Sequence, residues 1–310
     1  MQWVSSIRSV GAGRSRRSKF RGSMNLSARI ATWGSLVKFS HSVFALPFAL
    51  MMAAVLSRSM QVSPTLLVLL IVCVVAARTS AMAFNRIIDC EIDRRNPRTS
   101  GREIPKGTVS MREAWLLAVA SAVVFLAAAG LIGRHCLVLA PAVLMLLFGY
   151  SLMKRVSASC HFVLGLALAC APGGVWYALT GEWSAKPLPL MAAVLCWVAG
   201  FDILYSCQDR DFDRSSGLRS VPAKIGLRAA IVFAAALHAC SIGLLALFGL
   251  SFGLGAFFWI GLSAFSMLLA SQYLAISARG IPCIDQVFFT RNGLASVLLF
   301  LAVLADTLVS

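Results

Sequence analysis

Apolar residues dominate the chain in long runs that are separated by short polar connections. A helix needs about 20 mainly apolar residues to cross the hydrocarbon core of a bilayer. By this criterion the sequence predicts an all-α, polytopic membrane bundle of about nine spanning helices, with boundaries good to a few residues. The predicted spans cover residues 35–57, 64–88, 113–132, 135–153, 159–180, 188–208, 227–249, 252–275 and 288–308.

The composition supports a membrane protein and argues against a soluble one. Apolar residues make up 59% of the chain, charged residues make up 13%, and the mean hydropathy is +0.83. An ordinary soluble domain carries about 25% charged residues. The short connections leave no room for a separate soluble domain. We therefore expect two parts: a basic, disordered N-terminal arm over residues 1–28 and one transmembrane domain over residues 29–310.

The net charge of +16 indicates orientation in the membrane and not a nucleic-acid partner. Sixteen of the 28 Lys and Arg residues lie at the ends of spans two, four, six and eight and in the connections beside them. The connections on the opposite side contain only Arg58, Arg134 and Lys186. Because basic connections stay in the cytoplasm, we expect the N-terminus on that side. The expected location is the cytoplasmic (inner) membrane of a bacterial type of cell.

Two acidic motifs stand at the predicted cytoplasmic ends of spans two and six. Their patterns are N-x3-D-x3-D and D-x2-Y-x3-D-x3-D, and on a helix such spacings place the side chains along one face. Two acidic faces repel each other unless a cation holds them together, and Mg²⁺ bridges carboxylates to phosphates in this way. The motif residues are Asn85, Asp89, Asp93, Asp202, Tyr205, Asp209 and Asp213.

Basic side chains accompany both motifs. Arg78 lies inside span two, seven residues before Asn85, so about two helical turns bring it to the same face. A charge within a membrane segment indicates a functional site or a salt bridge inside the bundle. The segment Arg94–Gly107, which follows the first motif, contains Pro and Gly together with several basic residues. Such residues suit the oxygen atoms of a diphosphate.

The motifs and their basic neighbours resemble the signature of the UbiA family of membrane prenyltransferases, over roughly Lys38 to Asn292. The resemblance implies a helical bundle around a central cavity that opens to the cytoplasm. It also implies an enzyme, an aromatic polyprenyltransferase of quinone biosynthesis, that uses about two Mg²⁺ ions. The expected partners are a polyprenyl diphosphate, an aromatic acid and the lipid bilayer. No nucleic acid is expected, and no protein partner can be inferred.

The resemblance suggests a role for each candidate residue. Metal binding is expected of Asn85, Asp89, Asp93, Asp209 and Asp213. Diphosphate binding is expected of Arg78, Arg98, Arg102, Lys154 and Arg155. The candidates for activating the acceptor are Asp202, Tyr205 and Asp209, and the sequence gives no way to choose among them. Weaker candidates for acceptor binding are Lys38 and Tyr150.

Several of these residues have a simpler interpretation as well. Lys38 can extend its charge to the membrane interface, and the pair Lys154 and Arg155 can anchor span four as a topology signal. The nine cysteines show no metal-type spacing. Cys90 and Cys207, beside the motifs, are expected to be packing residues.

Two questions stay open at this point. The first question is the identity of the acceptor. Segments Tyr150–Arg155 and Arg98–Gly107 most resemble the corresponding segments of enzymes that act on a 4-hydroxybenzoate-type acceptor. Segments Phe39–Leu50 and Asn85–Pro105 look closer to those of enzymes that use a dihydroxynaphthoate-type acid for menaquinone.

The second question is the class of protein, because an ion-coupled secondary transporter also uses intramembrane carboxylates. The clustering of acidic groups at one membrane face, and not at the midplane, favours the enzyme.

Overall fold

The computed structural model describes residues 32–37 and 44–309, without the side chains of 285–289, so the N-terminal arm and Lys38 lie outside the described residues. Within them every regular element is a helix, which confirms the all-α prediction. The long helices are α3 (Pro64–Ile88), α6 (Met111–Ile132), α7 (Arg134–Val156), α8 (Cys160–Thr180), α9 (Leu188–Ser206), α12 (Leu227–Ser251), α13 (Ala256–Arg279) and α14 (Ile284–Val309). The short ones are α2 (Leu46–Leu56), α4 (Cys90–Arg95), α5 (Glu103–Lys106), η2 (Cys207–Asp209), α10 (Arg210–Ser215), α11 (Val221–Ile225) and η3 (Ile281–Cys283).

Among the described residues, eight helices are long and apolar enough to cross a membrane, so the protein is an integral, multi-pass membrane protein. They correspond to the second to ninth predicted spans. The first predicted span, 35–57, is represented by the 11-residue helix α2. At about 1.5 Å per residue this helix measures roughly 16 Å, too short to cross alone. A ninth span therefore stays a prediction, because residues 38–43 lie outside the described part of the chain.

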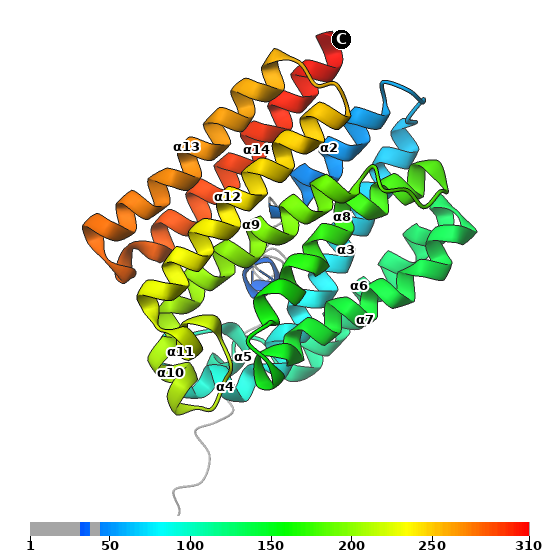
Figure 1. Cartoon of the computed structure of the whole chain (residues 1–310). Helices are drawn as coiled ribbons and strands as arrows, with labels where there is room; N and C mark the ends of the chain where they lie inside the picture. Colours follow the sequence, from blue (N-terminus) through cyan, green and yellow to red (C-terminus); the bar gives the residue numbers. More distant parts are fainter. Residues whose placement is uncertain (1–31, 38–43, 310) are drawn as a thin grey trace, which may run out of the picture.

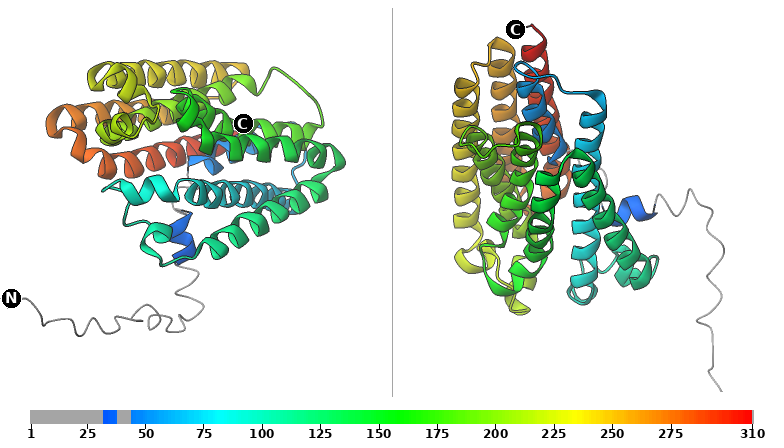
Figure 2. Two further views of the ribbon diagram at one scale, coloured as in Figure 1. Left: turned by 90° about the horizontal axis from the view of Figure 1, so that it is seen from below. Right: turned by 90° about the vertical axis from the view of Figure 1, so that its right-hand side faces the viewer.

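The helices form two groups, which are joined where α7 packs on α8 and where α2 contacts α3. In one group α3 packs on α6 and α7, and in the other α9 packs on α12 while α13 packs on α14. Helix α2 contacts α8 on one side and α14 on the other, and α8 contacts α9. The right-hand view of Figure 2 shows α12, α13 and α14 on one side of the bundle and α3 and α6 on the opposite side. The short helices α4, α5, α10 and α11 gather at one end, away from the C-terminus (Figure 1).

Helix α9 lies at the centre of the bundle. More than half of the residues in its most apolar window are buried (56%), against at most 39% in the other candidate spans. Its Trp197 is fully buried and packs against Phe44, Phe48 and Phe265, with ring centroids 5.1–6.2 Å apart. Aromatic rings at such distances attract each other beyond the effect of burial alone. The helix that carries the second acidic motif is therefore held from several sides.

Both acidic motifs cross a break in their helix, which the spacing of the sequence did not predict. Helix α3 ends at Ile88, and Asp89 joins it to the six-residue helix α4 with φ −86° and ψ 0°. Asp209 joins α9 and η2 to the six-residue helix α10 with φ −98° and ψ 3°. This region of backbone space is sparsely populated and is frequent in active sites. The Asp93 N–H still donates to the Asp89 carbonyl at 2.7 Å, so the side chains of the first motif keep a common direction.

A close approach between α8 and α9 depends on a glycine. A Cβ atom added to Gly165 would lie 2.5 Å from the backbone oxygen of Leu195, nearer than real Cβ atoms come to such a neighbour. A backbone atom cannot move aside as a flexible side chain can. The two helices that frame the cavity described below are thus in direct backbone contact at this point.

We predict that Gly165→Ala separates α8 from α9 and destabilises the protein by about 1–3 kcal/mol, the usual effect of overpacking. Thermal unfolding in detergent measures this change. Gly243→Ala in α12 is the matched control, because an added Cβ there meets no atom within 4 Å. Equal melting temperatures for the two variants would contradict the close contact.

Candidate active site

A cavity of about 710 Å³ lies at the end of the bundle that carries the short helices, and its lining comes from both groups of helices. It contains every residue that the sequence singled out for the site, except Lys38, which lies outside the described residues. These lining residues are Arg78, Asn85, Asp89, Asp93, Arg98, Arg102, Tyr150, Lys154, Arg155, Asp202, Tyr205, Asp209 and Asp213. The two acidic motifs therefore face one common space.

Asp89, at the break after α3, is held from two directions. Arg155 Nη2 of α7 donates to Asp89 Oδ1 at 2.8 Å and to the Ile88 carbonyl at 2.9 Å. Asn85 Nδ2 donates to Asp89 Oδ2 at 3.0 Å. Burial raises the pKa of the Asp89 carboxyl above its ordinary value, while the Arg155 guanidinium favours the ionised form and opposes that rise. Each carboxylate oxygen of Asp89 thus accepts a hydrogen bond, one from a guanidinium group and one from a neutral amide.

Asp93, on α4, pairs with the loop that follows the first motif. Arg102 Nη1 donates to both carboxylate oxygens of Asp93, at 2.6 and 2.7 Å. Thr99 Oγ1 donates to the Asp93 carbonyl at 3.2 Å. Asp93 is buried at 4% exposure. These contacts fold the loop back over the motif from which it emerges.

The same loop also reaches the second motif. Arg98 Nε donates to Asp209 Oδ1 at 2.8 Å, and Arg98 Nη2 donates to Asp209 Oδ2. Arg98 Nη1 donates to the Tyr205 hydroxyl at 2.7 Å, and Asn96 Nδ2 donates to Asp209 Oδ1 at 2.9 Å. Burial alone would lower the pKa of Arg98, but the hydrogen bonds and charge of Asp209 and the neighbouring Tyr205 raise it above the ordinary value. Arg98 therefore ties the loop after the first motif to the second motif.

Asp213, on α10, is fully buried and forms an ion pair with Lys154 of α7, at 2.8 Å from Nζ to Oδ1. The backbone N–H of Arg219, in the loop after α10, donates to the Lys154 carbonyl at 2.8 Å. The pair Lys154 and Arg155 thus does more than anchor the end of a span. Lys154 reaches the second motif, and Arg155 reaches the first.

Asp202 differs from these four aspartates, because its partner is a histidine. His161 Nδ1, on the first turn of α8, lies 2.6 Å from Asp202 Oδ2. His161 is buried at 2% exposure and lines the cavity. Sequence reasoning did not select His161 or Asn96. The available signals were a histidine at the polar start of a span, soon after Lys154, and an asparagine between the first motif and Arg98.

The charges that line the cavity are balanced. Six basic and six carboxylate side chains contribute to it, besides His161. The basic side chains are Arg78, Arg86, Arg98, Arg102, Lys154 and Arg155, and the carboxylates are Asp89, Asp93, Glu103, Asp202, Asp209 and Asp213. A balanced set suits a ligand that contains both positive and negative charge. A magnesium diphosphate is such a ligand, since the metal ions nearly cancel the charge of the diphosphate.

The donor set fits Mg²⁺ on chemical grounds. Carboxylate and amide oxygens from both motifs line one space, and Mg²⁺ prefers oxygen ligands. Among the residues that the structure describes, no three carboxylate, imidazole or thiol groups stand close enough to hold a metal alone. Mg²⁺ in proteins usually binds through one or two carboxylates together with substrate phosphates. All nine cysteines are free, and Cys90 and Cys207 are buried in hydrophobic clusters.

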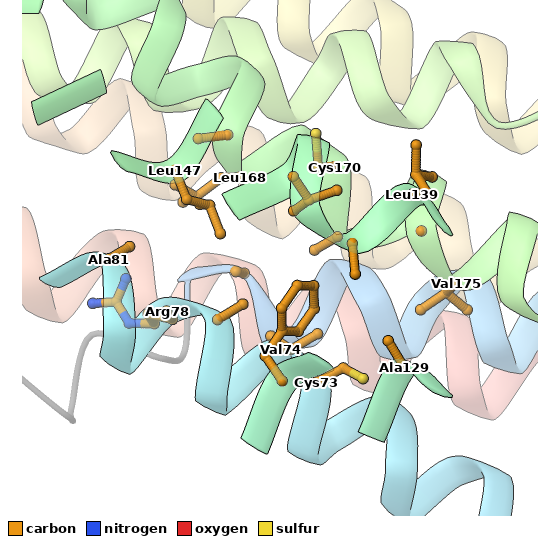
Figure 3. Close-up of a pocket in the computed structure, with 18 of the residues that line it drawn as sticks. Cys73, Val74, Arg78, Ala81, Ala129, Leu139, Leu147, Leu168, Cys170 and Val175 are labelled. Atoms are coloured by element: carbon orange, nitrogen blue, oxygen red, sulfur yellow. The ribbon is translucent and has the colours of Figure 1, made fainter. Parts of the chain in front are cut away.

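A second, apolar cavity of about 160 Å³ adjoins the first. Both cavities are lined by Arg78, Met82, Tyr150, Leu164 and Leu168. Figure 3 shows the nitrogen atoms of Arg78 at one end of the apolar cavity, with carbon and sulfur atoms along the rest. Arg78 Nε is buried and has no hydrogen-bond partner in the described structure. A buried donor at this junction is suited to an anionic group whose apolar remainder lies in the second cavity.

Comparison with known proteins agrees with this arrangement. Residues 45–303 match the model of the UbiA prenyltransferase family. The chain is 30% identical over 242 residues to a 4-hydroxybenzoate octaprenyltransferase of Pseudomonas syringae pv. tomato, which covers 74% of this chain and 77% of the relative. A relative of the same name from Pseudomonas syringae pv. syringae is 31% identical over 236 residues, with the same coverage of both chains.

Solved structures of UbiA homologs are also similar to this protein. A UbiA homolog from Aeropyrum pernix K1 has a TM-score of 0.78 and 33% identity, covering 86% of this chain and 98% of the homolog. A UbiA homolog from Archaeoglobus fulgidus, bound to GPP and Mg²⁺, shares the fold with a TM-score of 0.65 and 21% identity, over 89% and 99% of the two chains. These findings confirm the expected enzyme class, aromatic prenyltransferase, over a transporter. The chain belongs to the UbiA prenyltransferase family.

Proposed function

We propose that the protein transfers a polyprenyl group from an allylic polyprenyl diphosphate to an aromatic acid of the 4-hydroxybenzoate type, with Mg²⁺. The observation that carries this proposal is the common cavity of the two acidic motifs, which adjoins an apolar cavity at Arg78. The relatives in Pseudomonas syringae are 4-hydroxybenzoate octaprenyltransferases by name. The homolog from Archaeoglobus fulgidus was solved with GPP and Mg²⁺.

The ion pairs of the cavity suggest how the diphosphate binds. Bound Mg²⁺ would supply electrostatic stabilisation of the diphosphate leaving group. Asn85, Asp89, Asp93, Asp209 and Asp213 would hold about two ions, and each carboxylate would exchange its basic partner for metal. The basic side chains would then be free to donate to phosphate oxygens. Such an exchange would leave no buried charge without a partner, which is costly.

The partners released by that exchange are those expected to bind the diphosphate. Arg98, Arg102, Lys154 and Arg155 each pair with one motif aspartate. Arg78 has a free buried donor at the entrance to the apolar cavity. We infer that Arg78 contacts the phosphate nearest the prenyl chain. Together these donors stabilise the negative charge that develops as the C–O bond breaks.

The apolar cavity has a separate task. Its walls come from α3, α6, α7 and α8 and contain few polar atoms besides Arg78 and Tyr150. Such walls exclude water, which would otherwise trap the developing allylic cation. They also shelter the isoprenoid chain. We propose that the site opens to the cytoplasmic side of the inner membrane, on the charge pattern of the connections.

We predict that Asp89→Ala and Asp209→Ala each lower Mg²⁺-dependent prenyl transfer on the order of 100-fold or more, because each removes a ligand for the metal–diphosphate unit. Turnover is measured with isolated membranes and radiolabelled prenyl diphosphate. Glu91→Ala is the matched control, since Glu91 lies within the same segment but is 59% exposed and pairs with Arg94 and Arg95. Retained turnover in the Asp89 or Asp209 variant would contradict the role of that carboxylate as a metal ligand.

A side chain introduced into the apolar cavity should select against long donors. An added Cβ at Gly174 meets no atom within 4 Å, and Gly174 lines this cavity. We expect Gly174→Leu to reduce kcat/KM for a long polyprenyl diphosphate at least about tenfold more than for dimethylallyl diphosphate, since one buried side chain changes binding by 1–3 kcal/mol. Gly243→Leu in α12 is the control. An equal loss of kcat/KM for both donors would show that the isoprenoid chain binds outside this cavity.

A competition assay identifies which aromatic acid is the preferred acceptor. We expect transfer to 4-hydroxybenzoate in the presence of an equal amount of a dihydroxynaphthoate acid, the alternative acceptor for menaquinone. Radiolabelled prenyl diphosphate and chromatography of the lipid products measure the ratio. Transfer mainly to the naphthoate would keep the proposed chemistry but assign the protein to the other quinone.

A further inference from the structure

Asp202 is distinguished among the cavity aspartates by the charge of its partner. The four other aspartates, on both motifs, pair with guanidinium or ammonium groups at 2.8 Å or less. The hydrogen bond that the described residues give Asp202 comes from His161, at 2.6 Å. A guanidinium or ammonium group that pairs with a carboxylate competes with a substrate hydroxyl for its oxygen atoms. Among the described motif aspartates, Asp202 is the one whose partner is an imidazole, and that contact uses Oδ2 and leaves Oδ1 for a hydroxyl donor.

The backbone fixes which proton His161 carries. The N–H of Val221, at the start of α11, donates to His161 Nε2 at 3.2 Å. An Nε2 atom that accepts a hydrogen bond has no proton of its own, so in the neutral ring the proton resides on Nδ1. Nδ1 then donates to Asp202 Oδ2. The ring is buried at 2% exposure, so both contacts are shielded from competing water.

The surroundings of Asp202 suit an aromatic ring that carries a hydroxyl group. The side chain of Asp202 is 28% exposed within the cavity, so it remains accessible to a ligand. The neighbouring cavity wall on α8 and α9 is apolar, and it includes Leu164, Leu168, Val198 and Phe201. The basic partners of the other aspartates contribute the polar part of the same cavity. An acceptor ring against the apolar wall would place its hydroxyl group within reach of the carboxylate.

We propose that His161 is a positioning residue: its Nδ1–H holds Asp202 Oδ2, so that Oδ1 accepts the hydroxyl proton of the phenolic acceptor. This inference rests on the proposed function, since it concerns the acceptor of that reaction. The residues of the second motif then have two different roles. Asp202 serves the acceptor, and Asp209 and Asp213 serve the diphosphate.

The transfer releases diphosphate and leaves the acceptor with its hydroxyl group. The hydroxyl proton passes to Asp202 Oδ1, and the ring carbon forms a bond to C1 of the prenyl group. The bond between C1 and the diphosphate oxygen breaks, and its electron pair leaves with the diphosphate. The proton on the attacked ring carbon then passes to the released diphosphate, and the ring oxygen regains a proton from Asp202. No oxidant or further reactant is required.

Two substitutions at His161 separate its two hydrogen bonds. In His161→Asn the amide nitrogen takes the place of Nδ1 and can donate to Asp202. In His161→Gln the amide oxygen takes the place of Nε2 and can accept from Val221, but the donor to Asp202 is lost. We expect kcat of the Gln variant to fall roughly 10- to 100-fold, as for loss of a hydrogen bond to a charged group, and the Asn variant to stay within about threefold of wild type. KM for geranyl diphosphate should change in neither variant.

The acceptors used are 4-hydroxybenzoate and its 3-fluoro derivative, or the corresponding dihydroxynaphthoates if the wild type prefers those. The fluorine makes the hydroxyl more acidic, so the loss in the Gln variant, relative to wild type on the same acceptor, should shrink. Calorimetric binding of Mg²⁺ with pyrophosphate should be equal in all proteins. In an Asp202→Asn background, His161→Gln should have no further effect. If His161→Gln lowers stability, the comparison of the double variant with Asp202→Asn still tests whether His161 acts through Asp202.

Equal activity of the Asn and Gln variants, whether high or low, would overturn the role of His161. An unchanged loss with the fluorinated acceptor, or a loss of pyrophosphate binding, would do the same. Failure of the proposed function has a different signature, because wild type would then transfer no prenyl group to either class of acceptor. The two failures are thus distinguished by the wild-type measurement alone.

Discussion

Ion pairs between the motif aspartates and the basic side chains of neighbouring elements are the constraint on which the rest of this structure depends. A buried carboxylate without a partner is costly, so each of these aspartates requires a donor nearby. Three of the pairs connect segments that are far apart in the sequence: Arg98 to Asp209, Lys154 to Asp213 and Arg155 to Asp89. The same contacts close the end of the bundle and gather the groups that a metal diphosphate needs. In our proposal, stability and function thus depend on one set of charges.

Much of this organisation could be predicted from the sequence. Hydropathy located the eight candidate spans, because the bilayer imposes a length on every helix that crosses it. The spacing of three and four residues placed the aspartates of each motif on one face, and the resemblance to a known family suggested that the two faces meet. Arg78, about two turns before Asn85, lines the same cavity.

Other features could not be predicted, for physical reasons. Helical spacing cannot reveal a backbone break, so the junctions at Asp89 and Asp209 appear in the structure alone. Which base pairs with which acid depends on the direction of loops, and the Arg98 loop reaches the motif farther along the chain. His161 was missed because its partner Asp202 lies on another helix and 41 residues away. Local patterns carry no information about such contacts.

The exchange of ion pairs for metal can be seen in a map of the wild-type protein with Mn²⁺ and a non-hydrolysable geranyl diphosphate analogue. We expect anomalous density for the metal between Asp89 and Asp209. We also expect Arg98 and Lys154 to have moved from their aspartates to oxygen atoms of the diphosphate. A bound diphosphate with these ion pairs intact, and with no metal at the motif carboxylates, would contradict this exchange.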